Sequence, residues 1–269
     1  MFFKTNDHVS IYYEVIGEGK PLFMLPGWTC TTKFWKNNIQ ELSKHYKLIL
    51  MDMRGHGQSE AVKHGHRISR YAADVKDLLT YLDVENVTVM GWSMGASILW
   101  SYLELFGNHR IDSLICIDQS PAQYIKSDWQ WGQKACYDVE TFIETCAAAK
   151  YDPHGAAQGL IGACLKHEPS AEDKNMLVGE IDKCDPYVRI EIMRDHTNLD
   201  WRDFIPHITV PTLILCAKES RVFDYQSSLW IGEHIKNAKT VVFEDCSHML
   251  FFEKPEQFNK EVIEFIDTL

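Results

Sequence analysis

The chain has 269 residues, of which 45% are hydrophobic and 24% are charged, as is typical of a folded globular protein rather than a disordered or fibrous one. Its formal net charge of −11 argues against a nucleic-acid partner, because an acidic protein repels phosphates and no cluster of Lys or Arg offsets the charge. No apolar run of about eighteen residues occurs, and the first residues do not resemble a signal peptide. We therefore expect a cytoplasmic protein that makes no membrane contact.

The first part of the chain alternates between strand patterns and helix patterns. Residues 2–16 predict an antiparallel strand pair. Apolar runs predict further strands at 21–25, 46–52, 87–90 and 111–117. Helical patterns lie between them, at 32–45, 69–82 and 96–107. Strands that alternate with helices indicate βαβ units, so the sequence predicts a mostly parallel sheet with helices on both faces.

The alternation of strand and helix patterns stops between residues 122 and 207. Helical patterns replace it, including 139–150 and 155–167, and the strand pattern returns afterwards at 210–216 and 240–244. Helices are predicted at 227–235 and 255–269. We interpret residues 122–207 as a helical cap inserted into a sheet domain made of residues 1–121 and 208–269.

Cysteine and histidine spacing gives no sign of a metal site. The eight cysteines include no Cys-x-x-Cys pair, and some, such as Cys116 and Cys216, lie in apolar strand patterns. They are typical of buried thiols in a reducing compartment. No pair of histidines or cluster of carboxylates has ligand spacing on one element, so we expect neither a metal nor a cofactor.

A Gly-Trp-Ser-Met-Gly segment lies between the strand pattern at 87–90 and the helix that follows it. Gly91 and Gly95 allow a strained turn that would hold the Ser93 hydroxyl outward at the edge of the sheet. A serine hydroxyl is a poor nucleophile by itself, so it needs a base within hydrogen-bond reach and a third group that orients the base. The pattern alone is short enough to occur by chance, and the other loops must support it.

His248 is the best candidate for that base among the twelve histidines. It follows the last predicted strand, and the carboxyl ends of parallel strands meet at one edge of the sheet, where Ser93 also lies. His56, in Arg-Gly-His-Gly, is a second loop histidine at this edge, and we interpret it as a structural turn residue. His196 is interpreted as part of the packing of the insertion.

Four motifs occur in a fixed order and together resemble the α/β-hydrolase superfamily over essentially the whole chain, in particular its esterase, lactonase and cofactor-free haloperoxidase-like branch. They are Leu-Pro-Gly-Trp at 25–28, Asp-Met-Arg-Gly-His-Gly-Gln-Ser at 52–59, Gly-Trp-Ser-Met-Gly at 91–95 and Ser-His at 247–248. The resemblance implies an eight-stranded α/β sheet, a Ser93 nucleophile and an oxyanion hole made by the backbone N–H groups of Trp28 and Met94. Pro26 replaces a histidine that is frequent in the family, and this leaves the backbone donors in place.

The acidic partner of His248 departs from the family pattern. Relatives usually carry Asp in the loop after the strand at 213–216, and this chain has Ser220 there. Asp118 directly follows the strand pattern at 111–117, where some members of the superfamily carry the acid. We predict that Asp118 orients His248, with Glu219 and Asp224 as alternatives. The competing interpretation is that Asp118 only caps the following turn.

These residues predict a serine hydrolase that cleaves a small or medium carboxylic ester or lactone. Aromatic side chains are expected to line its substrate pocket, namely Trp92, Tyr124, Trp129 and Trp131. One alternative is a perhydrolase of the cofactor-free haloperoxidase type, and another is a protein that binds a ligand on this scaffold without turnover. The sequence leaves open whether the chain acts alone or as a homodimer.

Overall fold

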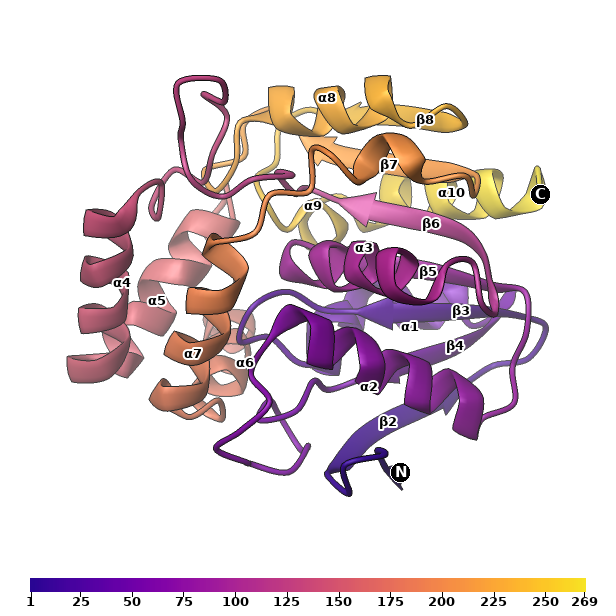
Figure 1. The fold of residues 1–269 in the computed structure, drawn as a ribbon, viewed down its shortest axis with the longest axis horizontal. Coiled ribbons are helices and arrows are strands. Elements are labelled where there is room, and N and C mark those ends of the chain that lie inside the picture. Colours follow the sequence, from indigo (N-terminus) through magenta and orange to yellow (C-terminus); the bar gives the residue numbers. More distant parts are fainter.

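The computed structural model describes residues 1–269, and eight strands form a single sheet in it (Figure 1). The strands are β1 (Phe2–Lys4), β2 (Ser10–Ile16), β3 (Lys20–Leu25), β4 (Tyr46–Met51), β5 (Val87–Trp92), β6 (Ile111–Ile117), β7 (Thr212–Ala217) and β8 (Ala238–Phe243). Their spatial order is β1-β2-β4-β3-β5-β6-β7-β8. β2 pairs antiparallel with β1 and β4, and every other neighbouring pair is parallel. The predicted fold class is confirmed.

Helices cover both faces of this sheet. One face carries α2 (Ile68–Tyr81), α3 (Met94–Phe106) and α8 (Tyr225–His234) (Figure 1). The other carries the 3-10 helix η1 (Thr32–Trp35), α1 (Lys36–Leu42), α9 (Leu250–Glu253) and α10 (Pro255–Asp267). Each face therefore has its own hydrophobic core, and all six residues of β5 are buried between the two. Burial on both faces explains why the sequences of the central strands are nearly continuous apolar runs.

Four helices between β6 and β7 stand together beyond the carboxyl ends of the parallel strands (Figure 1). They are α4 (Val139–Tyr151), α5 (Pro153–Cys164), α6 (Ala171–Asp182) and α7 (Pro186–Thr197), and the short 3-10 helix η2 (Ile205–His207) leads from them back to the sheet. Each begins at a side chain that accepts a hydrogen bond from a first-turn backbone N–H, and these caps are Asp138, Asp152, Ser170 and Asp185. Polar caps of this kind mark where the chain can start a helix.

The helix expected at 32–45 differs from the structure. Thr31 accepts a hydrogen bond from the N–H of Lys33, which begins one turn of 3-10 helix, and the α-helix itself then runs only over Lys36–Leu42. The short helix Leu250–Glu253 was not expected at all. No helix in the structure combines the length and the apolar character needed to cross a membrane.

Candidate active site

Ser93 lies on a strained turn between β5 and α3. Its backbone has φ of 54° and ψ of −126°, a conformation that is rare for a residue with a side chain. A Cβ on Gly91 would lie 2.5 Å from the carbonyl carbon of Gly95, and one on Gly95 would lie 2.6 Å from the carbonyl oxygen of Leu25. Both positions therefore require glycine, as the sequence motif predicts.

His248 is held in one orientation beside this turn. Its Nδ1–H donates to Oδ2 of Asp118 over 2.6 Å, and its backbone carbonyl accepts from the indole N–H of Trp92 over 3.0 Å. The ring packs against Trp92 and Phe223, with centroid distances of 5.1 and 5.5 Å. Because Nδ1 carries the proton of this bond, Nε2 of the neutral ring is a proton acceptor.

Asp118 is the first residue after β6, and its carboxylate accepts three hydrogen bonds. Oδ1 accepts from the N–H of Ala217 over 3.0 Å, and Oδ2 accepts from Oγ of Ser220 over 2.7 Å as well as from His248. The Asp118 side chain is buried, so these bonds replace the water that a carboxylate would otherwise require. Ser220, at the usual family position for the acid, thus touches the carboxylate that the structure places against His248.

The two alternative acids contact other groups. Glu219 accepts a hydrogen bond from the N–H of Asp245 over 2.9 Å. Asp224 accepts from the N–H of Gln226 over 3.0 Å and so caps the start of α8. Of the three candidates, the structure brings only Asp118 to His248.

The two expected oxyanion donors lie on either side of Ser93. Met94 is the first residue of α3, so its N–H has no acceptor one turn back in the helix. A Cβ on Gly27 would lie 3.1 Å from Cβ of Ser93, which shows how closely the loop that carries Trp28 passes over the turn. The N–H of Trp28 donates to no backbone carbonyl.

The loop that carries Trp28 is held from two directions. The indole N–H of Trp28 donates to the carbonyl oxygen of Arg189 in α7 over 3.0 Å. Asp52, which follows β4, accepts from the N–H groups of Thr32 over 2.8 Å and of Gln58 over 3.0 Å. The motif at 52–59 therefore supports the proposed oxyanion loop through Asp52. Burial raises the pKa of Asp52 against the lowering effect of these two bonds.

A small cavity of about 30 Å³ lies beside Ser93, and Trp28, Met94 and His248 line it too. Sequence reasoning missed three polar residues in its wall, namely Gln123, Gln133 and His196. His196 is buried in α7, its ring makes no hydrogen bond, and burial lowers its pKa to about 3, so it is neutral near pH 7. None of the three belongs to a motif, and only the folding of residues 122–207 over the sheet brings them here.

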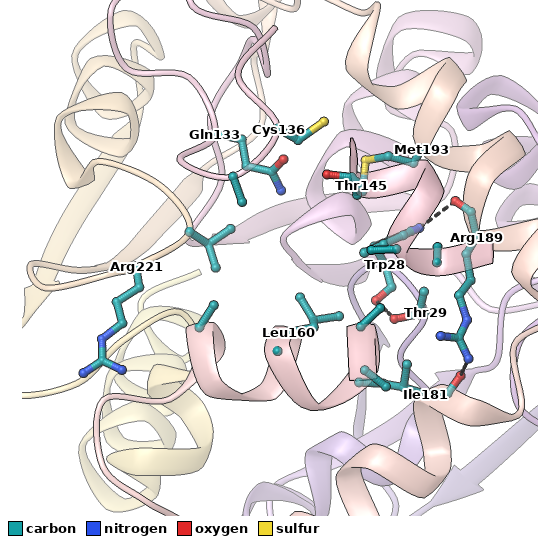
Figure 2. A pocket seen from close by; sticks show the side chains of 18 residues that line it. Trp28, Thr29, Gln133, Cys136, Thr145, Leu160, Ile181, Arg189, Met193 and Arg221 are labelled. Atoms are coloured by element: carbon teal, nitrogen blue, oxygen red, sulfur yellow. Dashed lines mark hydrogen bonds between the residues drawn. The ribbon is translucent and has the colours of Figure 1, made fainter. Parts of the chain in front are cut away.

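A larger cavity of about 210 Å³ adjoins the first one (Figure 2). This larger cavity lies among α4, α5 and α7. The two cavities have five wall residues in common, namely Trp28, Gln133, Leu160, Met193 and Val222. The space beside Ser93 therefore continues into the larger cavity.

Of the aromatic residues expected to line the pocket, only Trp92 lines the cavity beside Ser93. Trp129 is buried, donates its indole N–H to the carbonyl of Ala122 and packs edge-on against Trp131 and Trp230. The hydroxyl of Tyr124 donates to Oγ1 of Thr197. Tyr124, Trp129 and Trp131 line neither cavity, which corrects the expectation, because this aromatic cluster packs the loop before α4 rather than the space above Ser93.

His56 has a different environment from His248. It is buried, its Nδ1 bonds to the carbonyl of Arg54 over 3.0 Å, and burial lowers its pKa to about 4. It lines neither cavity. No group of three or more His, Cys, Asp or Glu side chains is placed so that it could hold a metal ion.

Comparison with known proteins identifies the family to which this architecture belongs. A family model described as the alpha/beta hydrolase fold matches residues 20–255. The chain belongs to the alpha/beta hydrolase family. The resemblance predicted from the motifs is thereby confirmed, and the protein is an enzyme of the hydrolase class.

Similar proteins align with nearly the whole length of this hydrolase. The non-heme chloroperoxidase CPO-A1 of Kitasatospora aureofaciens is 35% identical, and the match covers 98% of each chain. The AB hydrolase superfamily protein YisY of Bacillus subtilis (strain 168) is 29% identical over 99% of each chain. The solved structure of the esterase EaEST from Exiguobacterium antarcticum superposes with a TM-score of 0.95 at 25% identity, and it covers 99% of each chain.

Proposed function

We propose that the protein is a serine hydrolase that cleaves a small or medium carboxylic ester or lactone through an acyl-enzyme. The main support for this proposal is the position of Ser93 relative to His248 and Asp118. Ser93 on its strained turn lines the same cavity as His248, whose Nδ1 is bonded to the buried carboxylate of Asp118 over 2.6 Å. The similarity to a solved esterase supports the choice of an ester as substrate.

In the proposed mechanism, Oγ of Ser93 attacks the ester carbonyl while Nε2 of His248 accepts the hydroxyl proton. The N–H groups of Trp28 and Met94 bind the oxyanion, and one such donor commonly contributes about 3 kcal/mol to transition-state stability. Asp118 stabilises the imidazolium. His248 then returns the proton to the departing alcohol oxygen, and a water activated by the same histidine hydrolyses the acyl-enzyme.

We also propose roles for the remaining parts of the chain. Residues 122–207 form a cap over the site, since α4 to α7 stand beyond the strand ends that carry Ser93 and Asp118. All eight cysteines are free thiols, which supports a reducing, cytoplasmic location. The expected partner is a small molecule.

A second candidate function is perhydrolysis, and the 35% identical chloroperoxidase favours it. The same three residues would serve, with hydrogen peroxide in place of water attacking the acyl-enzyme to release a peracid. Bromination measured in acetate and peroxide, compared with ester hydrolysis under the same conditions, separates the two activities. A preparation that brominates faster than it hydrolyses every ester would favour perhydrolysis.

Labelling and turnover test the proposed hydrolase. We expect a fluorophosphonate probe to label the protein at Ser93 and the protein to hydrolyse p-nitrophenyl butyrate. The Ser93→Ala variant should lose the label and about 10⁴-fold or more of its kcat, because the nucleophile is removed. Ser101→Ala, which alters a buried serine of the same helix, should retain both. An unlabelled Ser93 together with no turnover of any ester, or tight ligand binding without turnover, would contradict the proposal.

A further inference from the structure

We infer that the larger cavity among α4, α5 and α7, the acyl chamber, binds the acyl chain of the substrate, and that the preferred substrate is an ester of an uncharged carboxylic acid of about eight carbon atoms. This inference rests on the proposed serine hydrolase function and adds the substrate class. The chamber is connected to Ser93, its wall is mainly apolar, and His248 does not line it.

The chamber is connected to the nucleophile through shared walls. Trp28, Leu160 and Met193 line both the chamber and the cavity that contains Ser93. Figure 2 shows Met193 above Trp28, and Leu160 on the helix below them. An acyl chain attached to Ser93 therefore has a route into the larger space.

Small apolar side chains create the space. The facing surfaces of α4 and α5 contribute short residues to the wall, namely Ala148, Ala149, Ala156, Ala157, Gly159 and Ala163. Twelve of the eighteen lining residues are hydrophobic. A wall in which apolar side chains predominate binds hydrocarbon through burial of apolar surface.

The two arginines in the wall both donate hydrogen bonds to backbone carbonyls. The guanidinium of Arg189 donates to the carbonyls of Cys184, Pro153 and Ile181 over 2.8, 2.9 and 2.9 Å. A carboxylate at the end of an acyl chain would have to displace such bonds. The chamber therefore fits an uncharged chain.

Arg221 has carbonyl partners as well. Its guanidinium donates to the carbonyls of Gly162 and Leu165 at the end of α5, over 3.2 and 3.3 Å. Figure 2 shows its side chain pointing away from the other labelled residues. Arg221 thus does not present its charge to a ligand in the chamber.

The volume of the acyl chamber limits the length of the acyl chain that it can hold. An apolar protein cavity of about 150 Å³ holds one benzene molecule with its six carbons. The acyl chamber, at about 210 Å³, therefore has room for about eight carbons on the same scale.

The position of the chamber selects the acyl side of the ester rather than the alcohol side. The leaving oxygen must lie next to His248, which returns the proton to it, and His248 lines only the small cavity. Trp28 and Thr29, in the loop proposed to bind the oxyanion, line the chamber. The acyl chain therefore extends toward α4 and α5, away from His248.

A series of p-nitrophenyl esters from acetate to dodecanoate tests this inference in the full-length protein. We expect kcat/KM of the wild type to rise with chain length, by about fourfold for each methylene that becomes buried, and to fall beyond about eight carbons. The half-ester of a dicarboxylic acid of eight carbons should react more slowly than the octanoate ester.

Two substitutions shorten the chamber, and a third provides a matched control. Ala149→Leu and Ala156→Leu each add three carbon atoms to the wall, so the optimum should shift by about three carbons, and the octanoate-to-acetate ratio of kcat/KM should fall about 50-fold. Ala147→Leu makes the same change on an exposed face of α4 outside the chamber and should leave the ratio unchanged. Leu160→Ala should shift the optimum to longer chains.

The outcomes separate this inference from the proposed function. The inference fails and the hydrolase proposal stands in either of two cases. In the first, the wild type hydrolyses the acetate ester without any chain-length preference. In the second, Ala149→Leu and Ala156→Leu both keep the chain-length profile of the wild type. If alkyl acetates of increasing alcohol length show the preference and the variants abolish it, the chamber binds the alcohol and the acyl assignment is overturned. If no ester reacts at all, the proposed function fails first.

Discussion

Ser220 and His248 contact the same oxygen atom of Asp118, over 2.7 and 2.6 Å. The loops after β6 and β7 therefore meet at one point beside the imidazole. The acid of the proposed triad can thus come from either loop, since both reach the Nδ1 side of the histidine. This contact gives a physical reason why a chain with serine at the usual family position still has a carboxylate at its histidine.

Substitutions of Asp118 test this assignment. Asp118→Asn should lower kcat for p-nitrophenyl butyrate by about 10⁴-fold, because an amide cannot stabilise the imidazolium by charge. Glu219→Gln and Asp224→Asn should change kcat by less than about twofold, since neither side chain contacts His248. Full activity in Asp118→Asn would refute the assignment.

An exchange of the two side chains provides a stricter test. Asp118→Ser should be nearly inactive, and addition of Ser220→Asp in the same chain should restore kcat at least about tenfold, because the carboxylate then comes from the β7 loop. The single variant Ser220→Asp, which places two carboxylates together, should be less active than the wild type. A double variant no more active than Asp118→Ser would show that the two positions are not interchangeable.

Among the elements, α7 is connected through Arg189 to several neighbouring segments. The guanidinium of Arg189 is buried and bonds to carbonyls in α5 and at the end of α6, while its backbone carbonyl accepts from Trp28. One side chain thus ties three helices together. Its donors add hydrogen bonds to three backbone carbonyls of the neighbouring elements.

Loss of this side chain should weaken the whole capping region. Arg189→Met should lower the free energy of unfolding by about 3 kcal/mol, since three backbone carbonyls each lose a hydrogen bond from this buried guanidinium. Arg194→Met removes an exposed arginine of the same helix that pairs only with Glu191, and it should change stability by less than about 0.5 kcal/mol. Urea titration of both variants provides the comparison, and equal midpoints would contradict this role for Arg189.

Sequence periodicity predicted the sheet because each central strand is buried on both faces and each helix packs on a single face. The position after a strand end likewise predicted Ser93 and His248 at a shared edge. The interior of the capping region could not be predicted in this way. Trp129 packs against other aromatic rings, while His196 and Ala149 line cavities, because helix-on-helix packing decides which face turns inward. Aromatic character alone did not distinguish the wall of a pocket from a core.

Two of the four buried histidines of the molecule, His56 and His196, have pKa values that burial lowers to about 4 and about 3 from the usual 6.5. The unfolded chain binds protons at these rings below pH 6.5, whereas the folded protein does not. Their contribution to stability is therefore complete above pH 6.5 and is lost as the pH falls toward 4.

Acid unfolding of a variant measures this effect. Between pH 7.5 and 4.5, His196→Leu should lose about 3 kcal/mol less stability than the wild type, because about two pH units of differential protonation are removed. His64→Leu, at an exposed loop position, should follow the wild type. Urea titrations at the two pH values give the difference, and parallel losses in all three proteins would contradict the prediction.

Trp28 connects the proposed oxyanion hole to the helix α7. Its backbone N–H belongs to the proposed oxyanion hole, and its indole N–H is bonded to α7 over 3.0 Å. A displacement of α7 would therefore also move a group that stabilises the transition state. Defects in the capping helices would then appear in kinetics as slower turnover at saturating substrate, a signature that is usually ascribed to damage of the catalytic residues themselves.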